Sequence, residues 1–130
     1  MFYTKESPVH GIGLFAKEFI PMGTVWWQGT IGKNVIVFSE HQYNALLESN
    51  HSAMLDEIHK YAYYDFRTDG LIYICDNARY INHSTNPNCK HPLAKFISIT
   101  TRDIQKDEEL FEDYESYANC PWQRYSPNRL

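Results

Sequence analysis

Glycine and proline interrupt residues 1–40 so often that each apolar stretch there is only as long as a short strand. Within these stretches apolar and polar side chains tend to alternate, which is typical of a strand with one buried face. The alternation predicts strands before Pro8, near Leu14–Ala16, over Val25–Ile31 and over Val35–Phe38. We therefore expect the first part of the chain to be rich in β structure.

A helix is expected directly after the last of these strands. Ser39, with Gln42 three residues later, forms a capping-box pattern, so the helix should begin at Ser39 or Glu40. The helical pattern weakens around Ser49–Ser52. The apolar residues beyond this point either continue the helix or form a second short one before Tyr61, and they are Met54, Leu55 and Ile58.

A β-hairpin is predicted in the middle of the chain. Two strand-like runs, Tyr61–Arg67 and Leu71–Cys75, flank Thr68-Asp69-Gly70. An Asp-Gly pair suits the positive φ angles of a tight hairpin turn.

The second half of the chain is predicted to be loop with short strands. Asp76–Cys89 is rich in Asn, Ser and Pro and is expected to be mostly loop. A strand is expected within Ala94–Thr101, a turn over Arg102–Glu108 and a short strand at Leu110–Phe111.

The length of the chain, 130 residues, predicts one domain over residues 1–130. Its core should cover about residues 5–117, and the tail at 118–130 has to fold back to be ordered, with Ser126–Leu130 expected to be loose. All the motifs described below must then share one hydrophobic core.

The cysteines and the apolar pattern favour a soluble intracellular protein, cytoplasmic or, in a eukaryote, nuclear. Three cysteines are an odd number and no C-x-x-C spacing occurs, so neither a disulfide framework nor a zinc cage is suggested. The first residues do not resemble a secretory leader, and no apolar run is long enough to span a membrane.

The charge pattern argues against direct binding of nucleic acid. The net charge is -4, and no cluster of Lys and Arg offers the positive charge that phosphates require. Six of the nine residues from Asp107 to Glu115 are carboxylates. This segment would attract a cationic substrate such as a lysine-rich peptide, or it is simply a solvated acidic turn.

Three motifs occur in a fixed order along the chain. They are Gly11-Ile12-Gly13-Leu14-Phe15-Ala16, the segment Ala78–Cys89 with Asn82-His83-Ser84 at its centre, and Glu109-Leu110-Phe111-Glu112-Asp113-Tyr114. Together they resemble the SET-domain lysine methyltransferases over nearly the whole chain. The resemblance implies a mainly β fold with short helices, in which small sheets surround a C-terminal pseudoknot. It also implies S-adenosylmethionine as cofactor and a protein with an accessible lysine as substrate, and it leaves monomer or homodimer open.

The resemblance also assigns roles to particular residues. Tyr114 is implied as the catalytic tyrosine, beside the methyl group. Cofactor contacts are implied for the main chain of the first motif, for the Asn-His segment, for Tyr114 and for a C-terminal aromatic residue, which gives Ile12, Gly13, Leu14, Arg79, Asn82, His83, Tyr114 and Trp122. The walls of the lysine channel are expected to include Trp27, Tyr80, Glu112 and Tyr117.

Plainer interpretations of the same residues stay open. Gly11-Ile12-Gly13 lacks the third glycine of a dinucleotide loop and is otherwise a turn at the entry to a strand. The Asn82-His83 segment is otherwise a polar turn, Tyr114 a strand-end aromatic residue, and Trp122 a hydrophobic anchor for the tail. The spacing of His83, Cys89 and His91 matches no standard metal site, so no metal is expected.

Several residues depart from the family pattern, among them Thr85 in place of a common Cys and Asp107 in place of a common Gly. Trp27 stands where many relatives have tyrosine, and Glu112 stands where relatives often have Phe or Tyr. The cysteine-rich segment that binds zinc after many SET domains is absent beyond Tyr117, so zinc is not expected. The departures leave an alternative function: a catalytically inactive SET-like module that binds basic peptides.

Overall fold

A four-stranded sheet brings the first and last parts of the chain together. The structure is a computed structural model and describes residues 1–93 and 95–126. The strand order is β1 (Phe2–Glu6), β2 (Ile12–Ala16), β10 (Glu109–Glu112) and β7 (Asn82–His83). β10 is antiparallel to β2 and parallel to β7, so it lies between two segments that are distant from it in sequence.

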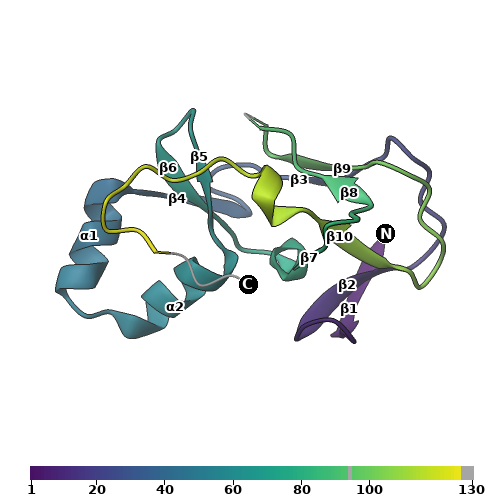
Figure 1. Cartoon of the computed structure of the whole chain (residues 1–130), viewed down its shortest axis with the longest axis horizontal. Coiled ribbons are helices and arrows are strands. Elements are labelled where there is room, and N and C mark those ends of the chain that lie inside the picture. Colours follow the sequence, from purple (N-terminus) through teal and green to yellow (C-terminus); the bar gives the residue numbers. More distant parts are fainter. Residues whose placement is uncertain (94, 127–130) are drawn as a thin grey trace.

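Two three-stranded sheets complete the β structure (Figure 1). One has the order β3 (Val25–Gln28), β9 (Ile97–Thr100), β8 (Cys89–Lys90). The other has the order β4 (Val35–Ser39), β6 (Gly70–Ile74), β5 (Tyr63–Asp65). All pairs within these two sheets are antiparallel.

Two short α-helices follow β4, as the sequence pattern allows. α1 (Glu40–Glu48) begins after Ser39, whose hydroxyl accepts the N–H of Gln42 while the Gln42 side chain accepts the N–H of Ser39. Asn50 has a positive φ of 53°, which ends the first helical segment before α2 (Ser52–Tyr61) begins. Two 3₁₀ helices, η1 (Asn77–Tyr80) and η2 (Tyr114–Ser116), precede β7 and follow β10.

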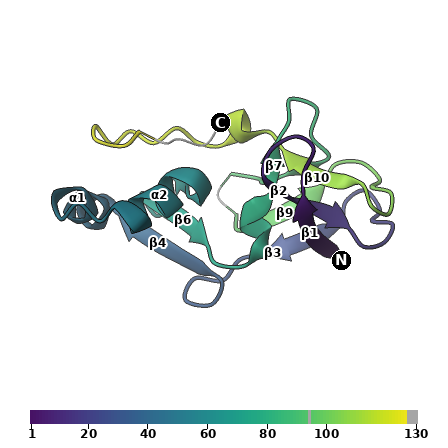
Figure 2. The same ribbon diagram turned by 90° about the horizontal axis from the view of Figure 1, so that it is seen from below.

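The buried apolar side chains form two clusters. The larger cluster joins all three sheets and includes Leu14, Ile104 and Leu110, all fully buried. The smaller cluster lies where α1, α2 and the β4-β6-β5 sheet meet the C-terminal segment, and it includes Tyr43, Ile58 and Trp122. Figure 2 shows the C-terminal segment running back along the side of the molecule that carries the helices.

The prediction of a mainly β fold with short helices is confirmed, but several strand boundaries were wrong. The strand predicted over Val25–Ile31 ends at Gln28, and the strand predicted within Ala94–Thr101 begins only at Ile97. The hairpin forms, but a four-residue turn over residues 66–69 connects its strands, and only Asp69 has a positive φ, of 46°.

The tail folds back as far as the described residues reach. Trp122 is 6% exposed and packs in the smaller cluster. Of the segment expected to be loose, residues 127–130 lie outside the described residues. Within the described residues, none of the helices combines the length and apolar character needed to cross a lipid bilayer.

Candidate active site

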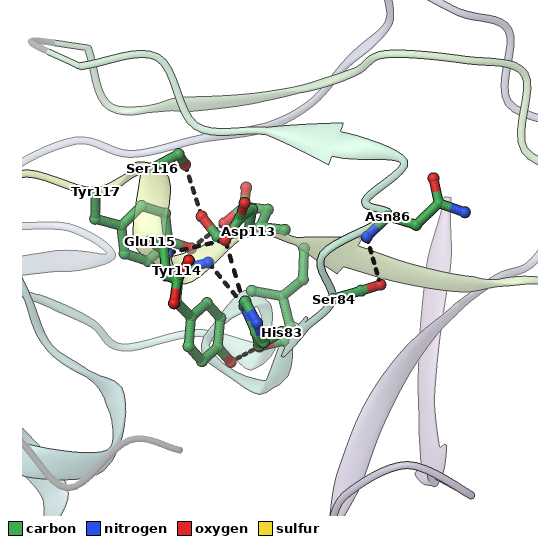
Figure 3. A network of polar contacts seen from close by, with 10 residues as sticks. His83, Ser84, Asn86, Asp113, Tyr114, Glu115, Ser116 and Tyr117 are labelled. Carbon is green, nitrogen blue, oxygen red and sulfur yellow. Dashed lines mark hydrogen bonds and ion pairs between the residues drawn. The ribbon is translucent and has the colours of Figure 1, made fainter.

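The Asn82-His83 segment and Tyr114 meet in space because β7 pairs with β10. Phe111 lies opposite Asn82 and Glu112 lies opposite His83 in this parallel pair. The backbone N–H of Tyr114 donates to Nδ1 of His83 at 3.0 Å, and the centres of their rings are 5.3 Å apart (Figure 3). Two segments that are separate in the sequence therefore form one structural unit.

Polar contacts on both sides of Tyr114 fix its position. Its hydroxyl donates to the carbonyl oxygen of Ile81. Asp113 caps η2, because its carboxylate accepts the N–H of Glu115 at 3.0 Å. Since His83 Nδ1 already accepts a hydrogen bond, that nitrogen carries no proton, and its 3.6 Å approach to Asp113 is not an ion pair. The geometry therefore makes His83 a support for the backbone of Tyr114.

Asn82 connects this unit to the first motif. Its side-chain amide donates to the carbonyl oxygen of His10 and to Oε2 of Glu109, each at 2.9 Å. Glu109 in turn accepts the hydroxyl of Ser7 at 2.9 Å. Asn82 and Glu109 are buried, at 6% and 7% exposure. This buried network holds the loop before β2 against the start of β10.

A cavity of about 310 Å³ opens beside this network. The loop before β2, the end of α2, and the segment from η1 into β7 form its walls together with Tyr114. The lining residues are His10, Gly11, Ile12, Lys60, Tyr61, Arg79, Tyr80, Ile81, Asn82 and Tyr114. We call this space the wide cavity.

A second, smaller cavity of about 40 Å³ adjoins the first and is walled mainly by aromatic rings. Its walls include Trp26, Trp27, Tyr63, His91, Ser98, Glu112 and Tyr117. The indole N–H of Trp27 donates to Asp76 at 3.1 Å, which fixes that ring in the wall. Five residues line both spaces, namely Lys60, Tyr61, Arg79, Ile81 and Tyr114. We call this second space the narrow cavity, and Tyr114 lies where the two cavities meet.

Arg79 lies between the two cavities and is held by tyrosines. Its guanidinium donates to the hydroxyls of Tyr73 at 3.2 Å and Tyr80 at 3.0 Å. It also lies over the rings of Tyr61 and Tyr80, at 5.4 and 5.0 Å from their centres. Burial raises the pKa of Tyr61 and of Tyr73, so both hydroxyls are neutral at physiological pH.

The acidic segment splits into buried and exposed carboxylates. Glu109 belongs to the network with Asn82, and Glu112 is 4% exposed and accepts the hydroxyls of Ser98 and Tyr117. Asp107 and Glu115 remain exposed. The segment is therefore not simply a solvated turn, and any attraction of cations depends on fewer charges than the sequence suggests.

The structure does not bring every predicted cofactor residue to the wall of the wide cavity. Leu14 is fully buried in the larger cluster, and Gly13 faces the Glu109 carboxylate, which a Cβ at this position would approach to 2.4 Å. Trp122 is in the smaller cluster, where its indole N–H donates to Asp69 at 3.0 Å. Trp122 is not among the residues that line either cavity, because the described part of the tail packs against the helices, and its contact with the cofactor stays a prediction.

Several residues of the site were not predicted from the sequence. Ser7 and Glu109 hold the network, and Tyr61, His91 and Ser98 line the cavities. Glu109 opens one of the three motifs, which was the only signal that pointed to it. Among the described residues, no group of three or more His, Cys, Asp or Glu side chains is placed to hold a metal ion.

Comparison with known proteins identifies the family. The sequence model of the SET-domain family matches residues 11–115 of this chain. This range includes all five residues that line both cavities. This chain therefore belongs to the SET-domain family.

Individual relatives agree with this assignment. The chain is 30% identical over 122 residues to "Putative histone-lysine N-methyltransferase 1" of Plasmodium falciparum (isolate 3D7), and 31% identical over 121 residues to "Histone-lysine N-methyltransferase 2D" of Homo sapiens. Each match covers 87% of this chain but only 2% of the relative. The crystal structure of a P. falciparum "putative histone methyltransferase" has a TM-score of 0.60 and 20% identity, covering 88% of this chain and 96% of that chain. The structural likeness shows that the fold is of the SET type.

Proposed function

We propose that this protein transfers a methyl group from S-adenosylmethionine to the side-chain nitrogen of a lysine in a protein substrate. The observation that carries the proposal is the position of Tyr114, which lines both the wide and the narrow cavity. Two adjoining cavities that share one tyrosine offer separate places for two reactants and one place where they meet. Methyl transfer is an in-line displacement, so its catalysis depends mainly on such positioning.

The residues of the wide cavity fit S-adenosylmethionine. A space of about 310 Å³ is within the range of small-molecule sites. The buried Nε of Arg79 has no hydrogen-bond partner among the described residues, so it is available to a polar ligand. The residues proposed to hold the cofactor are Gly11 and Ile12 through their main chain, together with Arg79, Tyr80 and Tyr114. The cofactor supplies a methyl group on a positively charged sulfur.

The roles of Asn82 and His83 in this proposal are to position other groups. Asn82 holds the loop at His10 in place, and His83 holds the backbone of Tyr114. Together, Asn82 and His83 hold the loop at His10 and the backbone of Tyr114 in fixed positions relative to each other. This differs from a direct contact with the cofactor, which the family resemblance implies for both.

The narrow cavity fits a lysine side chain. Rings such as Trp27, Tyr63 and Tyr117 can surround its methylene chain and exclude water. A lysine ammonium ordinarily has a pKa near 10.4, and burial between rings disfavours the charged form and helps to produce the neutral, nucleophilic amine. Tyr114 is proposed to orient this amine toward the methyl group. The proton that the nitrogen loses passes to solvent.

A methyl-transfer assay tests the proposal. Purified protein is incubated with S-adenosylmethionine carrying a labelled methyl group and with core histones or total cell protein, and products are located by mass spectrometry. Tyr114→Phe should lower the rate by about 100-fold or more while cofactor binding, followed by calorimetry, persists. Tyr3→Phe is the matched control, since it removes a hydroxyl on β1 that donates to Asp107, outside both cavities.

The outcomes separate the two functions considered. If no protein is methylated and the cofactor does not bind, the proposal fails. Affinity for basic peptides without any methyl transfer would instead support the inactive binding module. The names of the relatives make histones the first substrates to test. All three cysteines are free, which suits the reducing interior of a cell.

A further inference from the structure

We propose that His91 is a catalytic residue that removes the proton from the ammonium group of the substrate lysine before methyl transfer. Its Nε2 accepts this proton and passes it to solvent through a second space that the ring also borders. This inference rests on the proposed function and deepens it, because it names the group that makes the lysine amine nucleophilic.

The position of His91 supports this role. It directly follows β8, and its side chain is only 7% exposed. It lines the narrow cavity together with Tyr114. The rings of Tyr63 and Tyr117 meet the imidazole edge to face, with centres 4.7 and 5.9 Å from its own. The imidazole is therefore held in the wall of the space that is proposed to receive the lysine.

One hydrogen bond decides which ring nitrogen of His91 carries the hydrogen. Nδ1 lies 2.7 Å from the carbonyl oxygen of Ile97. Because a carbonyl oxygen can only accept, Nδ1 must be the donor. In the neutral ring Nε2 then has a lone pair and no hydrogen. No hydrogen bond within the described residues uses Nε2, so this nitrogen is available to a substrate.

A third space gives the proton a route to solvent. Its volume is about 10 Å³, roughly the space that one water molecule needs. Its lining includes Phe66 and Leu93, which are 54% and 50% exposed, and we call it the outer cleft. Three residues line both the narrow cavity and the outer cleft, namely Tyr63, His91 and Tyr117. Of these side chains only the imidazole can take up a proton, since a tyrosine hydroxyl already carries one.

The charged groups around His91 can stabilise the imidazolium that forms. Glu112 lines the narrow cavity at 4% exposure, and no ion pair in the described part of the chain involves it. Asp65 lines the outer cleft and pairs with Arg67 at 3.7 Å. A buried carboxylate in the same cavity favours a positive charge on the ring. Apart from the two rings in contact with His91, the other charged or titratable side chains that line either space are Lys60, Tyr61, Tyr64, Arg79 and Tyr114.

Protons and electrons balance in the proposed step. The lysine ammonium gives one proton to Nε2, which leaves a neutral amine and an imidazolium. The lone pair of the amine forms the new N–C bond, while the bond from the methyl carbon to the sulfur of the donor breaks and leaves its electron pair on sulfur. The imidazolium then releases its proton to water in the outer cleft, and the ring is neutral again.

The pH dependence of two variants tests this role. His91→Asn keeps an amide N–H for Ile97 but has no atom in place of Nε2, whereas His91→Gln offers an amide oxygen there that accepts a hydrogen bond but no proton. With saturating histone peptide and S-adenosylmethionine, each variant should lower kcat at neutral pH by about 100-fold or more. The loss should shrink as the pH rises toward about 10.4, the ordinary pKa of a lysine ammonium, because the amine then needs no base. His41→Asn, an exposed histidine on α1 that lines none of the three spaces, is the matched control and should keep the wild-type rate.

Two measurements without turnover separate catalysis from folding and binding. Calorimetry gives the Kd of the lysine peptide in the presence of S-adenosylhomocysteine, the donor without its methyl group, and this Kd should change less than about threefold in both variants. Nuclear magnetic resonance of the wild-type protein with isotope-labelled histidine should show His91 with its hydrogen on Nδ1 and none on Nε2. The second measurement needs no variant to fold.

The outcomes separate this inference from the proposed function. If the wild-type protein methylates lysine and His91→Asn keeps its rate, the role of His91 is wrong while the proposed function stands. An equal loss at every pH, a normal rate in His91→Gln, a larger change in the Kd of the peptide, or a hydrogen on Nε2 in the free protein would also overturn it. A wild-type protein that methylates no lysine would refute the proposed function itself.

Discussion

Replacing Gly13 by alanine is expected to lower the free energy of unfolding by about 2–4 kcal/mol. A Cβ at this position would lie 2.4 Å from Oε2 of Glu109 and 3.1 Å from Cβ of Ser7. The carboxylate would have to move, although it accepts hydrogen bonds from Ser7 and Asn82, each at 2.9 Å. Each such bond to a charged group contributes about 1.5–3 kcal/mol, and partial loss of both gives the stated range.

Urea denaturation followed by tryptophan fluorescence measures this change, and a double-mutant cycle assigns its cause. Glu109→Ala removes the carboxylate, so Gly13→Ala should cost less than about 1 kcal/mol in that background. An equal cost in both backgrounds would show that something other than Glu109 excludes a side chain. A cost below about 0.5 kcal/mol in the wild-type background would mean that the close approach is easily relieved.

Four further predictions concern groups outside the cavities. Hydrogen bonds from Tyr64 and Trp122 hold the pKa of Asp69 below its ordinary value of 3.8. The stability that this carboxylate contributes is therefore present above pH 3.8 and is lost as the pH falls below that value. Asp69→Asn should remove this dependence and flatten the acid side of a pH–stability profile. The hydrogen bond from Tyr64 to Asp69 raises the pKa of Tyr64 to about 12. The stability that this hydrogen bond contributes is present below pH 10 and should disappear as the pH rises through 12. Trp122→Phe should lower stability in urea by about 1–2 kcal/mol and leave cofactor affinity unchanged in calorimetry, because the indole N–H donates to Asp69, away from both cavities. Asn88→Ala should cost about 2–4 kcal/mol in the same urea assay, since its fully buried amide bonds to the carbonyl of Glu109 and the N–H of Phe111, each at 2.8 Å.

Features that depend on neighbouring residues could be predicted from the sequence. The capping box at Ser39 fixed the start of α1 because both of its hydrogen bonds join residues three apart. The hairpin around Asp69 followed from two alternating runs separated by a turn. The exact turn type did not follow, because Gly70 joins the strand and leaves only Asp69 with a positive φ.

Features that depend on distant residues could not be derived from local patterns. That the Asn82-His83 segment lies near Tyr114 was implied only by the family resemblance, and the pairing of β7 with β10 that brings them together was not predicted, since nothing in either segment specifies the other. Gly13 was expected to let the backbone approach a ligand, whereas the structure shows that a Cβ at this position would meet the carboxylate of Glu109, a neighbour that no local pattern indicated. The packing partners of Trp122 could not be predicted either, because a tail packs wherever an apolar surface is available, and here that surface is provided by Tyr43 and Tyr64.

The two buried carboxylates of β10 explain how one short strand can serve both cavities. Glu112 lies three positions after Glu109, and because three is odd, their side chains point to opposite faces of an extended strand. On one face, Glu109 joins Ser7 and Asn82 and holds the loop that borders the wide cavity. On the other face, Glu112 enters the narrow cavity. A strand buried on both faces normally carries apolar residues, so two carboxylates at these positions are costly unless each has a separate task. Both carboxylates accept hydrogen bonds within the fold: Glu109 from Ser7 and Asn82, and Glu112 from Ser98 and Tyr117.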